Sequence, residues 1–305
     1  MGSELAAAYP LAREAFEQAD EILGFSLSRL MWDGPEAELN DTINTQPALM
    51  VHSVAALRVL QAQFPDLKAA LVAGHSMGEL SALVAAGALP FPEAMRLVRT
   101  RGELMKRAGK ISAGGMAAIM GLDIPTLEAI CAQASLGEAS LGQATSGDEI
   151  VQVANDNCPG QVVISGSRAA LERAVAGAQA AGARRAVILA VSIAAHSPLM
   201  AHAQADFSQA VDKAPLADPV IPIIANITAR AMHTTAEVRA DLQGQLRSRV
   251  RWTESVQYMV EQGVSTFIEI GSGSVLCGLI KRIDRDATCL TLGTPQDFEK
   301  LGSLL

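Results

Sequence analysis

The 305-residue sequence has few aromatic residues, few charged residues and no long hydrophobic run. Phe, Trp and Tyr make up 4% of the chain, although half of its residues are hydrophobic. This composition favours helices packed closely on a sheet and excludes an intrinsically disordered chain. No apolar run reaches the roughly 18 residues of a transmembrane helix, and the N-terminus lacks signal-peptide and myristoylation patterns. We therefore expect a cytoplasmic protein that does not bind a membrane.

Basic residues and cysteines are also scarce. Lys and Arg number 24 against 32 Asp and Glu, so the net charge is −8. Nucleic-acid binders carry a basic excess, and we therefore expect no nucleic-acid partner. The four cysteines lie far apart without a Cys-x-x-Cys pair, which indicates structural thiols in a reducing compartment. They are Cys131, Cys158, Cys277 and Cys289. Carboxylates at metal-site spacing are missing too, so we expect no metal site.

The hydrophobic pattern of the first third predicts mostly helices. The one strand expected there is a short apolar run that reads as a buried parallel strand. The expected elements are a helix over Glu4–Gln18, a helix starting at Thr45-Gln46-Pro47, the strand Lys68–Ala73, a buried helix over Gly78–Ala86 and a helix over Pro92–Lys106.

From Met116 onward the predicted order changes to β-α-β-β-α-β, which is typical of a ferredoxin-like unit. Its expected elements are Met116–Leu122, Pro125–Ala134, Ile150–Asn155, Val162–Ser165, Ala169–Ala181 and Arg184–Val191. The Gly- and Ser-rich stretch Ser135–Asp148 predicts a surface loop. After Ser192 the alternation of helices and strands of the larger domain resumes, with strands at Ile221–Asn226 and Thr266–Ile270. We therefore expect an α/β core domain of residues 1–113 and 191–305, with a parallel sheet flanked by helices, and an inserted small ferredoxin-like α+β subdomain of residues 114–190.

The sequence Gly74-His75-Ser76-Met77-Gly78 stands between the predicted strand and the buried helix. This is the G-x-S-x-G pattern in the strand–turn–helix context of a nucleophile elbow, as in hydrolase-like α/β cores. The glycines permit a strained turn that exposes the Ser76 hydroxyl, and the helix N-terminus offers N–H groups to an oxyanion. The alternative is a tight turn with an incidental serine. We predict that Ser76 is a nucleophile.

A nucleophilic serine needs a base, and we favour His196 among five histidines. It follows the apolar segment Ala186–Ile193 and precedes Ser197-Pro198, which predicts a helix start with Ser197 as N-cap. Open α/β sheets place their sites at the carboxyl ends of strands. The alternative is a structural histidine. Of the other four, His52 lies on or beside the inward stripe of its helix, where we expect a core residue, and His75 is next to the nucleophile but points away across the turn. His202 lies inside a helix, and His233 lies in a polar loop.

Arg101 lies in the middle of an apolar helix stripe. Its neighbours on that stripe are Ala94, Leu97, Val98, Leu104 and Met105. A buried guanidinium needs an anionic or carbonyl partner, because an unpaired buried charge is very costly. That partner is either a structural carboxylate or the carboxylate of a substrate, which a bidentate fork would hold.

These motifs together resemble the malonyl-CoA:acyl-carrier-protein transacylase family of fatty-acid synthesis over nearly the whole chain. Arg101 follows Ser76 by 25 residues, as the carboxylate-binding arginine of that family does. The matching segments are Asn44-Thr45-Gln46-Pro47-Ala48, Gly74-His75-Ser76-Met77-Gly78-Glu79, Asn157 with Pro159-Gly160-Gln161-Val162, His196-Ser197-Pro198-Leu199-Met200, Val250-Arg251-Trp252-Thr253 and Glu269-Ile270-Gly271-Ser272-Gly273.

The resemblance implies a ping-pong acyl transfer without a cofactor. Ser76, activated by His196, takes the malonyl group from malonyl-CoA, and the phosphopantetheine thiol of acyl carrier protein then receives it. The resemblance also implies an oxyanion contact from the Met77 N–H and a backbone carbonyl at Arg251 that orients His196. We expect a monomer. The implied substrate-binding residues are Arg101, His75, Gln46 and Asn157.

Two departures from the family keep alternatives open. The family begins with a strand ending in Pro-Gly-Gln-Gly-Ser-Gln, whose glutamine N–H contributes to the oxyanion hole, and Met1-Gly2 matches only the end of that segment. We expect a chain without it to be weakly stable and poorly active, as a catalytically impaired carrier-protein-binding relic would be. Ala194-Ala195 before His196 leaves the acyl selectivity open. A serine hydrolase or thioesterase of the α/β-hydrolase type would use the same elbow, but it would give Arg101 no role.

Overall fold

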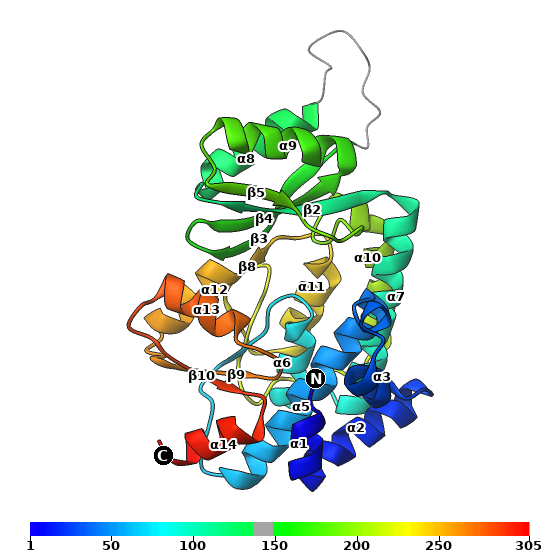
Figure 1. Cartoon of the computed structure of the whole chain (residues 1–305), viewed down its shortest axis with the longest axis vertical. Coiled ribbons are helices and arrows are strands. Elements are labelled where there is room, and N and C mark those ends of the chain that lie inside the picture. The colour runs from blue at the N-terminus through cyan, green and yellow to red at the C-terminus, as the bar shows by residue number, and fades with distance from the viewer. Residues whose placement is uncertain (137–148, 305) are drawn as a thin grey trace.

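The computed structural model describes residues 1–136 and 149–304 and has an α/β fold (Figure 1). In chain order its elements are α1 (Ser3–Ala8), α2 (Pro10–Leu23), α3 (Leu27–Asp33), α4 (Glu36–Leu39), α5 (Thr42–Gln63), β1 (Val72–Ala73), α6 (Gly78–Ala85), α7 (Phe91–Ile111), β2 (Gly114–Met120), α8 (Ile124–Leu136), β3 (Val151–Cys158), β4 (Gln161–Ser167), α9 (Arg168–Ala180), β5 (Arg185–Ile188), the 3-10 helix η2 (Pro198–Met200), α10 (Ala201–Lys213), β6 (Ile223–Ile224), β7 (Ala231–Met232), α11 (Thr235–Gln245), β8 (Val250–Arg251), α12 (Trp252–Glu261), β9 (Thr266–Ile270), α13 (Val275–Ile283), β10 (Thr288–Leu292) and α14 (Pro295–Gly302).

The strands of the described residues form three sheets. One has the order β1-β6-β7, in which β1 and β6 are parallel and β7 is antiparallel. The parallel strands β9 and β10 form the second. The third has the order β5-β2-β4-β3-β8, with antiparallel pairs except for the parallel contact of β3 with β8. In place of one parallel sheet, the described residues of the core thus form a short mixed sheet and a separate parallel pair of strands.

Two predicted helix boundaries in the N-terminal third are wrong. The single helix expected over Glu4–Gln18 is broken between α1 and α2, where Tyr9 is extended (φ −127°, ψ 118°) because a residue before proline avoids the helical region. Helix α5 begins at Thr42 and not at Thr45-Gln46-Pro47, with the Asp41 side chain accepting from the Ile43 N–H. Pro47 therefore lies inside the helix. The Ile43 carbonyl, which the missing N–H of Pro47 leaves free, accepts from Arg99 Nη1 at 2.9 Å instead.

Several predicted strands are shorter than their apolar runs. The run Lys68–Ala73 contributes only β1, Ile221–Asn226 contributes only β6, and Arg184–Val191 contributes only β5. The strand Thr266–Ile270 is confirmed as β9. Each of these runs pairs with its neighbours over only part of its length, and hydropathy alone does not mark where pairing stops.

The middle of the chain has the expected β-α-β-β-α-β order, from β2 to β5. Helices α8 and α9 pack on each other and cover one face of the five-stranded sheet (Figure 1). Buried side chains from this sheet and both helices form a hydrophobic cluster of their own. The surface loop predicted over Ser135–Asp148 lies, from residue 137 onward, outside the described residues.

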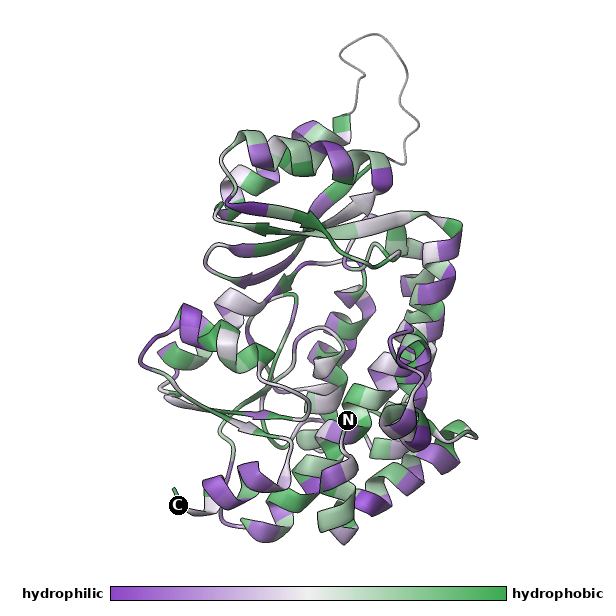
Figure 2. Ribbon diagram, in the orientation of Figure 1, coloured by the Kyte–Doolittle hydropathy of each residue, from purple (hydrophilic) through white to green (hydrophobic). Residues whose placement is uncertain are grey.

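Most of the core lies among the helices of the larger part. One hydrophobic cluster joins α1, α2, α5, α6, α7, α10 and α11, and a further cluster lies around α12 and α13. Figure 2 shows hydrophobic and hydrophilic residues alternating around surface helices such as α9 and α14, as expected when one face packs on the core. Helix α6, which follows Ser76, belongs to the first of these clusters, so the helix that positions the elbow is packed in the core.

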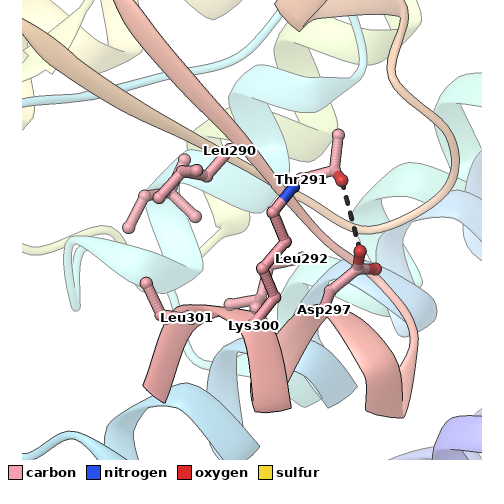
Figure 3. A pocket seen from close by; sticks show the side chains of 7 residues that line it. Leu290, Thr291, Leu292, Asp297, Lys300 and Leu301 are labelled. Carbon is pink, nitrogen blue, oxygen red and sulfur yellow. Dashed lines mark hydrogen bonds between the residues drawn. The ribbon is translucent and has the colours of Figure 1, made fainter. Parts of the chain in front are cut away.

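A small pocket between β10 and α14 is shown in Figure 3. There the Thr291 hydroxyl donates to Asp297 Oδ1 at 3.3 Å. The cavity volume of about 20 Å³ leaves room for about one water molecule. It is therefore too small for an acyl thioester, and its residues come from elements other than those that carry Ser76.

Within residues 1–136 and 149–304, no helix is long and apolar enough to cross a membrane. The same residues contain no group of three or more His, Cys, Asp or Glu side chains placed to hold a metal ion. The four cysteines are free thiols, and three of them are buried.

Candidate active site

Ser76 occupies a strained turn between β1 and α6. Its φ angle is +53°, in the left-handed region that non-glycine residues rarely adopt. Gly74 makes the turn possible, because a Cβ at that position would lie 2.0 Å from the Gly78 backbone carbonyl group. The Ser76 side chain remains partly exposed. This is the expected geometry of a nucleophile elbow.

His196 is placed to take the Ser76 proton. Its Nε2 lies 2.8 Å from Ser76 Oγ. Its Nδ1 lies 2.9 Å from the Gln245 carbonyl oxygen and 3.1 Å from that of Ser248. Because carbonyl oxygens only accept, Nδ1 carries the hydrogen and Nε2 is the acceptor for the Ser76 hydroxyl. The pair is a dyad oriented by backbone carbonyls.

The prediction that the Arg251 carbonyl orients His196 is wrong. The carbonyls that face His196 Nδ1 come from the end of α11 and the turn after it, at Gln245 and Ser248. The Arg251 carbonyl instead accepts from the Ser255 hydroxyl at 2.9 Å inside α12. Arg251 itself pairs with Glu254.

His196 lies in a turn before η2 and not directly at a strand end, since β5 stops at Ile188. Its φ angle is +58°, so both members of the dyad have left-handed backbones. Gln152 of β3 holds this turn by donating to the His196 carbonyl at 2.7 Å. The Ser197 hydroxyl donates to the Ala194 carbonyl. The prediction that Ser197 caps the following helix is therefore wrong, since its side chain makes no capping hydrogen bond.

The environment keeps His196 neutral. Burial, followed by the positive charge of Arg101, lowers the pKa of His196 from 6.5 to about 3. A neutral imidazole at pH 7 can accept a proton from Ser76. A histidine with so low a pKa is a weak base. It can take the Ser76 proton only if the imidazolium gains a counter-charge during the reaction, such as an oxyanion on the substrate.

Arg101 lies beside Ser76 as the helix pattern predicts. It is 1% exposed on α7. Its Nη2 donates to Ser76 Oγ at 3.0 Å and to Gln245 Oε1 at 2.9 Å, and its Nη1 donates to Gln46 Oε1 at 2.7 Å. Burial lowers its pKa to about 10, so it is charged at pH 7.

Among the described residues, the oxygens that accept hydrogen bonds from this guanidinium are all neutral. No carboxylate of the described residues forms an ion pair with Arg101, and within the same residues its Nε has no hydrogen-bond partner. A buried cation of this kind attracts an anion strongly. The sequence left open whether the partner of Arg101 is a structural carboxylate or the carboxylate of a substrate. Within the described residues, no structural carboxylate bonds directly to Arg101.

Three other predicted residues lie near the elbow without touching the dyad's reacting atoms. Gln46 on α5 holds Arg101. The His75 ring and Asn157 of β3 are hydrogen-bonded, with 2.8 Å between Nε2 and Oδ1, and the His75 ring packs edge-on against Trp252. His75 is thus directed away from the dyad and towards β3 and α12. Burial lowers its pKa, which keeps it neutral.

The Met77 N–H is free to bind an oxyanion. The next N–H groups along the chain bond to carbonyls of the turn, from Gly78 to His75 and from Glu79 to Ser76. No acceptor within the described residues takes the Met77 N–H. A free N–H that directly follows the nucleophile is suited to a tetrahedral intermediate.

His52, set aside by the sequence as a core residue, is confirmed in that role. It is 4% exposed, and its two ring nitrogens bond to Ser272 Oγ at 2.7 Å and to the Gly293 carbonyl at 2.9 Å.

Four buried polar residues behind the elbow escaped the sequence reasoning. Asn226 accepts from the Ser76 N–H at 2.8 Å and donates to the Gly74 carbonyl at 2.8 Å. Gln245 contacts Arg101, the Ser76 carbonyl and, through its own carbonyl, His196. Glu79 and Asp241 lie behind these two amides. A polar residue at the end of an apolar run could have pointed to Asn226, and an acidic residue in an apolar helix to Glu79.

The arrangement can perform acyl transfer on an anionic acyl group. It has a hydroxyl with a neutral base, a free N–H beside it and an unpaired buried cation next to the hydroxyl. These are the parts that nucleophilic catalysis at a carbonyl requires.

Comparison with known proteins agrees with this chemistry. Residues 1–294 match the family model described as an acyl transferase domain. A Malonyl CoA-acyl carrier protein transacylase of Haemophilus influenzae is 42% identical over 305 residues, covering 100% of this chain and 94% of the relative. The crystal structure of an acyl-carrier-protein-S-malonyltransferase from Bartonella henselae is 39% identical, with a TM-score of 0.92, and covers 100% of this chain and 94% of that one. The structure of a malonyl-transacylase in complex with its type II PKS acyl-carrier protein is 39% identical, with a TM-score of 0.91, and covers 100% of this chain and 95% of that one. The chain belongs to the acyl transferase domain family.

Proposed function

We propose that this protein transfers a malonyl group from coenzyme A to the phosphopantetheine thiol of acyl carrier protein in fatty-acid biosynthesis, through a malonyl-Ser76 intermediate. The observation that carries the proposal is the unpaired buried charge of Arg101, 3.0 Å from the Ser76 hydroxyl. A simple serine hydrolase has no use for a buried cation at that place. A malonyl thioester carries a free carboxylate, which pairs with it.

The first half-reaction acylates the serine. The Ser76 proton passes to His196 Nε2 while Ser76 Oγ attacks the thioester carbonyl. The resulting oxyanion is bound by the Met77 N–H and is the counter-charge for the His196 imidazolium. When the C–S bond breaks, His196 returns the proton to the departing thiolate of coenzyme A.

The second half-reaction mirrors the first. The phosphopantetheine thiol gives its proton to His196 and attacks the malonyl ester, and Ser76 leaves with that proton. Because His196 Nδ1 stays bonded to the Gln245 and Ser248 carbonyls, the ring keeps one orientation in both halves.

Arg101 holds the malonyl carboxylate in this mechanism. Gln46 and Gln245 fix the plane of the guanidinium with neutral oxygens and leave its charge available. Pairing with a carboxylate at a buried site favours malonyl over acetyl groups. His75 and Asn157 form a polar wall beside the elbow and contact the rest of the substrate.

The fold supports the same proposal. We assign residues 1–113 and 191–305 to a hydrolase-like core and residues 114–190 to a ferredoxin-like subdomain. The strand order β5-β2-β4-β3 within the five-stranded sheet supports the ferredoxin-like topology, with the subdomain's first and third strands, β2 and β4, in the centre. The strand–turn–helix around Ser76 supports the hydrolase-like core. The solved complex of a malonyl-transacylase with its acyl-carrier protein supports the choice of partner.

The test follows a radiolabelled malonyl group from malonyl-CoA. We expect it to appear on the protein and then on holo-acyl carrier protein, with little free malonate. Free malonate as the main product would identify a thioesterase. Label that never reaches the protein would identify a catalytically impaired relic. Acetyl-CoA is the matched control, because it has the same thioester and no carboxylate for Arg101.

A further inference from the structure

Two carboxyl groups lie buried behind the nucleophile elbow. Glu79, in the first turn of α6, is 0% exposed, and Asp241 of α11 is 5% exposed. Their side chains contact each other. Within the described residues one oxygen of each group, Glu79 Oε1 and Asp241 Oδ2, has no hydrogen-bond partner. Two carboxylates in contact repel each other unless they share a proton.

The other oxygen of each group accepts hydrogen bonds from amide groups. Glu79 Oε2 accepts from Asn226 Nδ2 at 2.5 Å and from Gln245 Nε2 at 2.6 Å. Asp241 Oδ1 accepts from the Ile227 N–H at 3.1 Å. Within the described residues, the oxygens of this cluster that still lack a partner are Glu79 Oε1 and Asp241 Oδ2, and one proton held between them would satisfy both.

We propose that Glu79 and Asp241 share one proton and act as a positioning pair that orients the amides of Asn226 and Gln245 towards the reacting groups. Glu79 carries the proton and donates it to Asp241, which is ionised. Burial and the neighbouring Asp241 both raise the pKa of Glu79 well above its usual value, in agreement with a neutral Glu79.

The orientation of the two amides follows from this pair. A side-chain amide has nearly the same shape at both ends, so its hydrogen-bond partners decide which end is the oxygen. Glu79 Oε2 accepts, and it therefore requires the NH₂ ends of Asn226 and Gln245. Their oxygens then face the Ser76 N–H and Arg101 Nη2. With Gln245 reversed, an NH₂ group would face the guanidinium, and Arg101 would keep only Gln46 of its two amide anchors.

The shared proton also sets the local charge. With one proton the pair carries a charge of −1, and the Gln245 amide separates it from the +1 of Arg101. Without the proton the cluster would carry a net negative charge and would weaken the attraction of Arg101 for an acyl carboxylate. The charged groups that act on Glu79 are Asp241 from α11 and Arg101 from α7.

Infrared spectroscopy at neutral pH tests the proton directly, without reference to function. A neutral carboxylic acid has a C=O stretch well separated from the bands of ionised carboxylates. We expect this band in the unchanged protein and its loss in Glu79→Gln, because the glutamine NH₂ replaces the donor. Glu17→Gln, at an exposed carboxylate, is the matched control and keeps the band. Absence of the band from the unchanged protein, or its persistence in Glu79→Gln, would overturn the proposal.

Acylation kinetics test the positioning role, which rests on the proposed malonyl transfer. Glu79→Leu leaves both amides without their common acceptor, so we expect the preference for malonyl-CoA over acetyl-CoA to fall about 5- to 150-fold, equivalent to one unsatisfied buried group. Glu79→Gln keeps an acceptor oxygen for the amides and should restore the preference. Equal preferences in the two variants, both close to or both below that of the unchanged protein, would contradict the role. If Glu79→Leu does not fold, the infrared result decides.

Discussion

The Nη2 atom of Arg101 donates a hydrogen bond to the hydroxyl oxygen of Ser76 at 3.0 Å. The same hydroxyl donates to His196, so one oxygen joins the nucleophile, the base and the cation. A charged donor on the hydroxyl oxygen stabilises the developing alkoxide, and the cation stays within reach of an acyl group once that group is attached to the serine.

Replacing Arg101 tests which acyl groups use this cation. Arg101→Ala should slow malonyl transfer about 30- to several-thousand-fold, corresponding to the roughly 2–5 kcal/mol for loss of one member of a buried charge pair. Acetyl transfer should fall less, because acetyl has no carboxylate. The measurement is kcat/KM for malonyl-CoA and acetyl-CoA. Arg96→Ala on the exposed face of α7 is the matched control. An equal loss for both substrates would mean that Arg101 is only structural.

Removal of the base should slow serine acylation strongly. We expect His196→Ala to reduce the rate of malonyl-Ser76 formation by about 10²- to 10⁴-fold through loss of general-base catalysis. Stopped-flow or quenched-flow measurement of the first turnover isolates this step. His202→Ala, at an exposed position in α10, should leave the rate unchanged. A full rate in His196→Ala would exclude this histidine as the base.

The buried His196 should also couple stability to pH. Its pKa is about 3 in the folded protein and about 6.5 in the unfolded chain, so between these values the unfolded chain binds more protons. The contribution is fully present above pH 6.5 and is lost as the pH falls towards 3. Between pH 7.5 and 5 the unchanged protein should lose about 2 kcal/mol more unfolding free energy than His196→Gln. Denaturant unfolding at both pH values measures this difference. The same loss in both proteins would show that His196 is not buried and neutral.

The two glycines of the elbow should respond differently to an added methyl group. Gly74→Ala places a Cβ 2.0 Å from the Gly78 backbone, so the turn must open and the protein should lose about 2 kcal/mol or more. Gly78→Ala meets no atom within 4 Å and should be neutral or stabilising by up to about 1 kcal/mol, because alanine favours a helix. Thermal unfolding of both variants gives the comparison. Equal destabilisation would contradict the tight approach of Gly74 to Gly78.

Much of the site could be predicted because its reactive residues stand in recognisable sequence patterns. A serine between two glycines marks the elbow, and an arginine on an apolar helix stripe marks the buried cation. Ser76, Arg101 and His196 are found side by side for these reasons. The order of strands and helices around β2 to β5 follows from hydrophobic periodicity in the same way.

The residues that hold these groups could not be predicted, because they act through atoms that every residue has or through side chains without a pattern. His196 is oriented by the backbone carbonyls of Gln245 and Ser248, and any residue there would offer one, which is why Arg251 was the wrong choice. Asn226 and Gln245 come together only when the end of β6 and the end of α11 meet behind Ser76. The start of α5 was misplaced because Asp41 caps it and Arg99 compensates for Pro47, a contact made across 56 residues of sequence.

The central claim is that the Ser76 hydroxyl forms a covalent malonyl ester. Intact-protein mass spectrometry after mixing with malonyl-CoA tests it most directly. Ser81→Ala, in helix α6 just after the elbow, is the matched control. We predict one malonyl adduct on the unchanged protein and on Ser81→Ala, and none on Ser76→Ala. An undiminished adduct on Ser76→Ala would contradict the account.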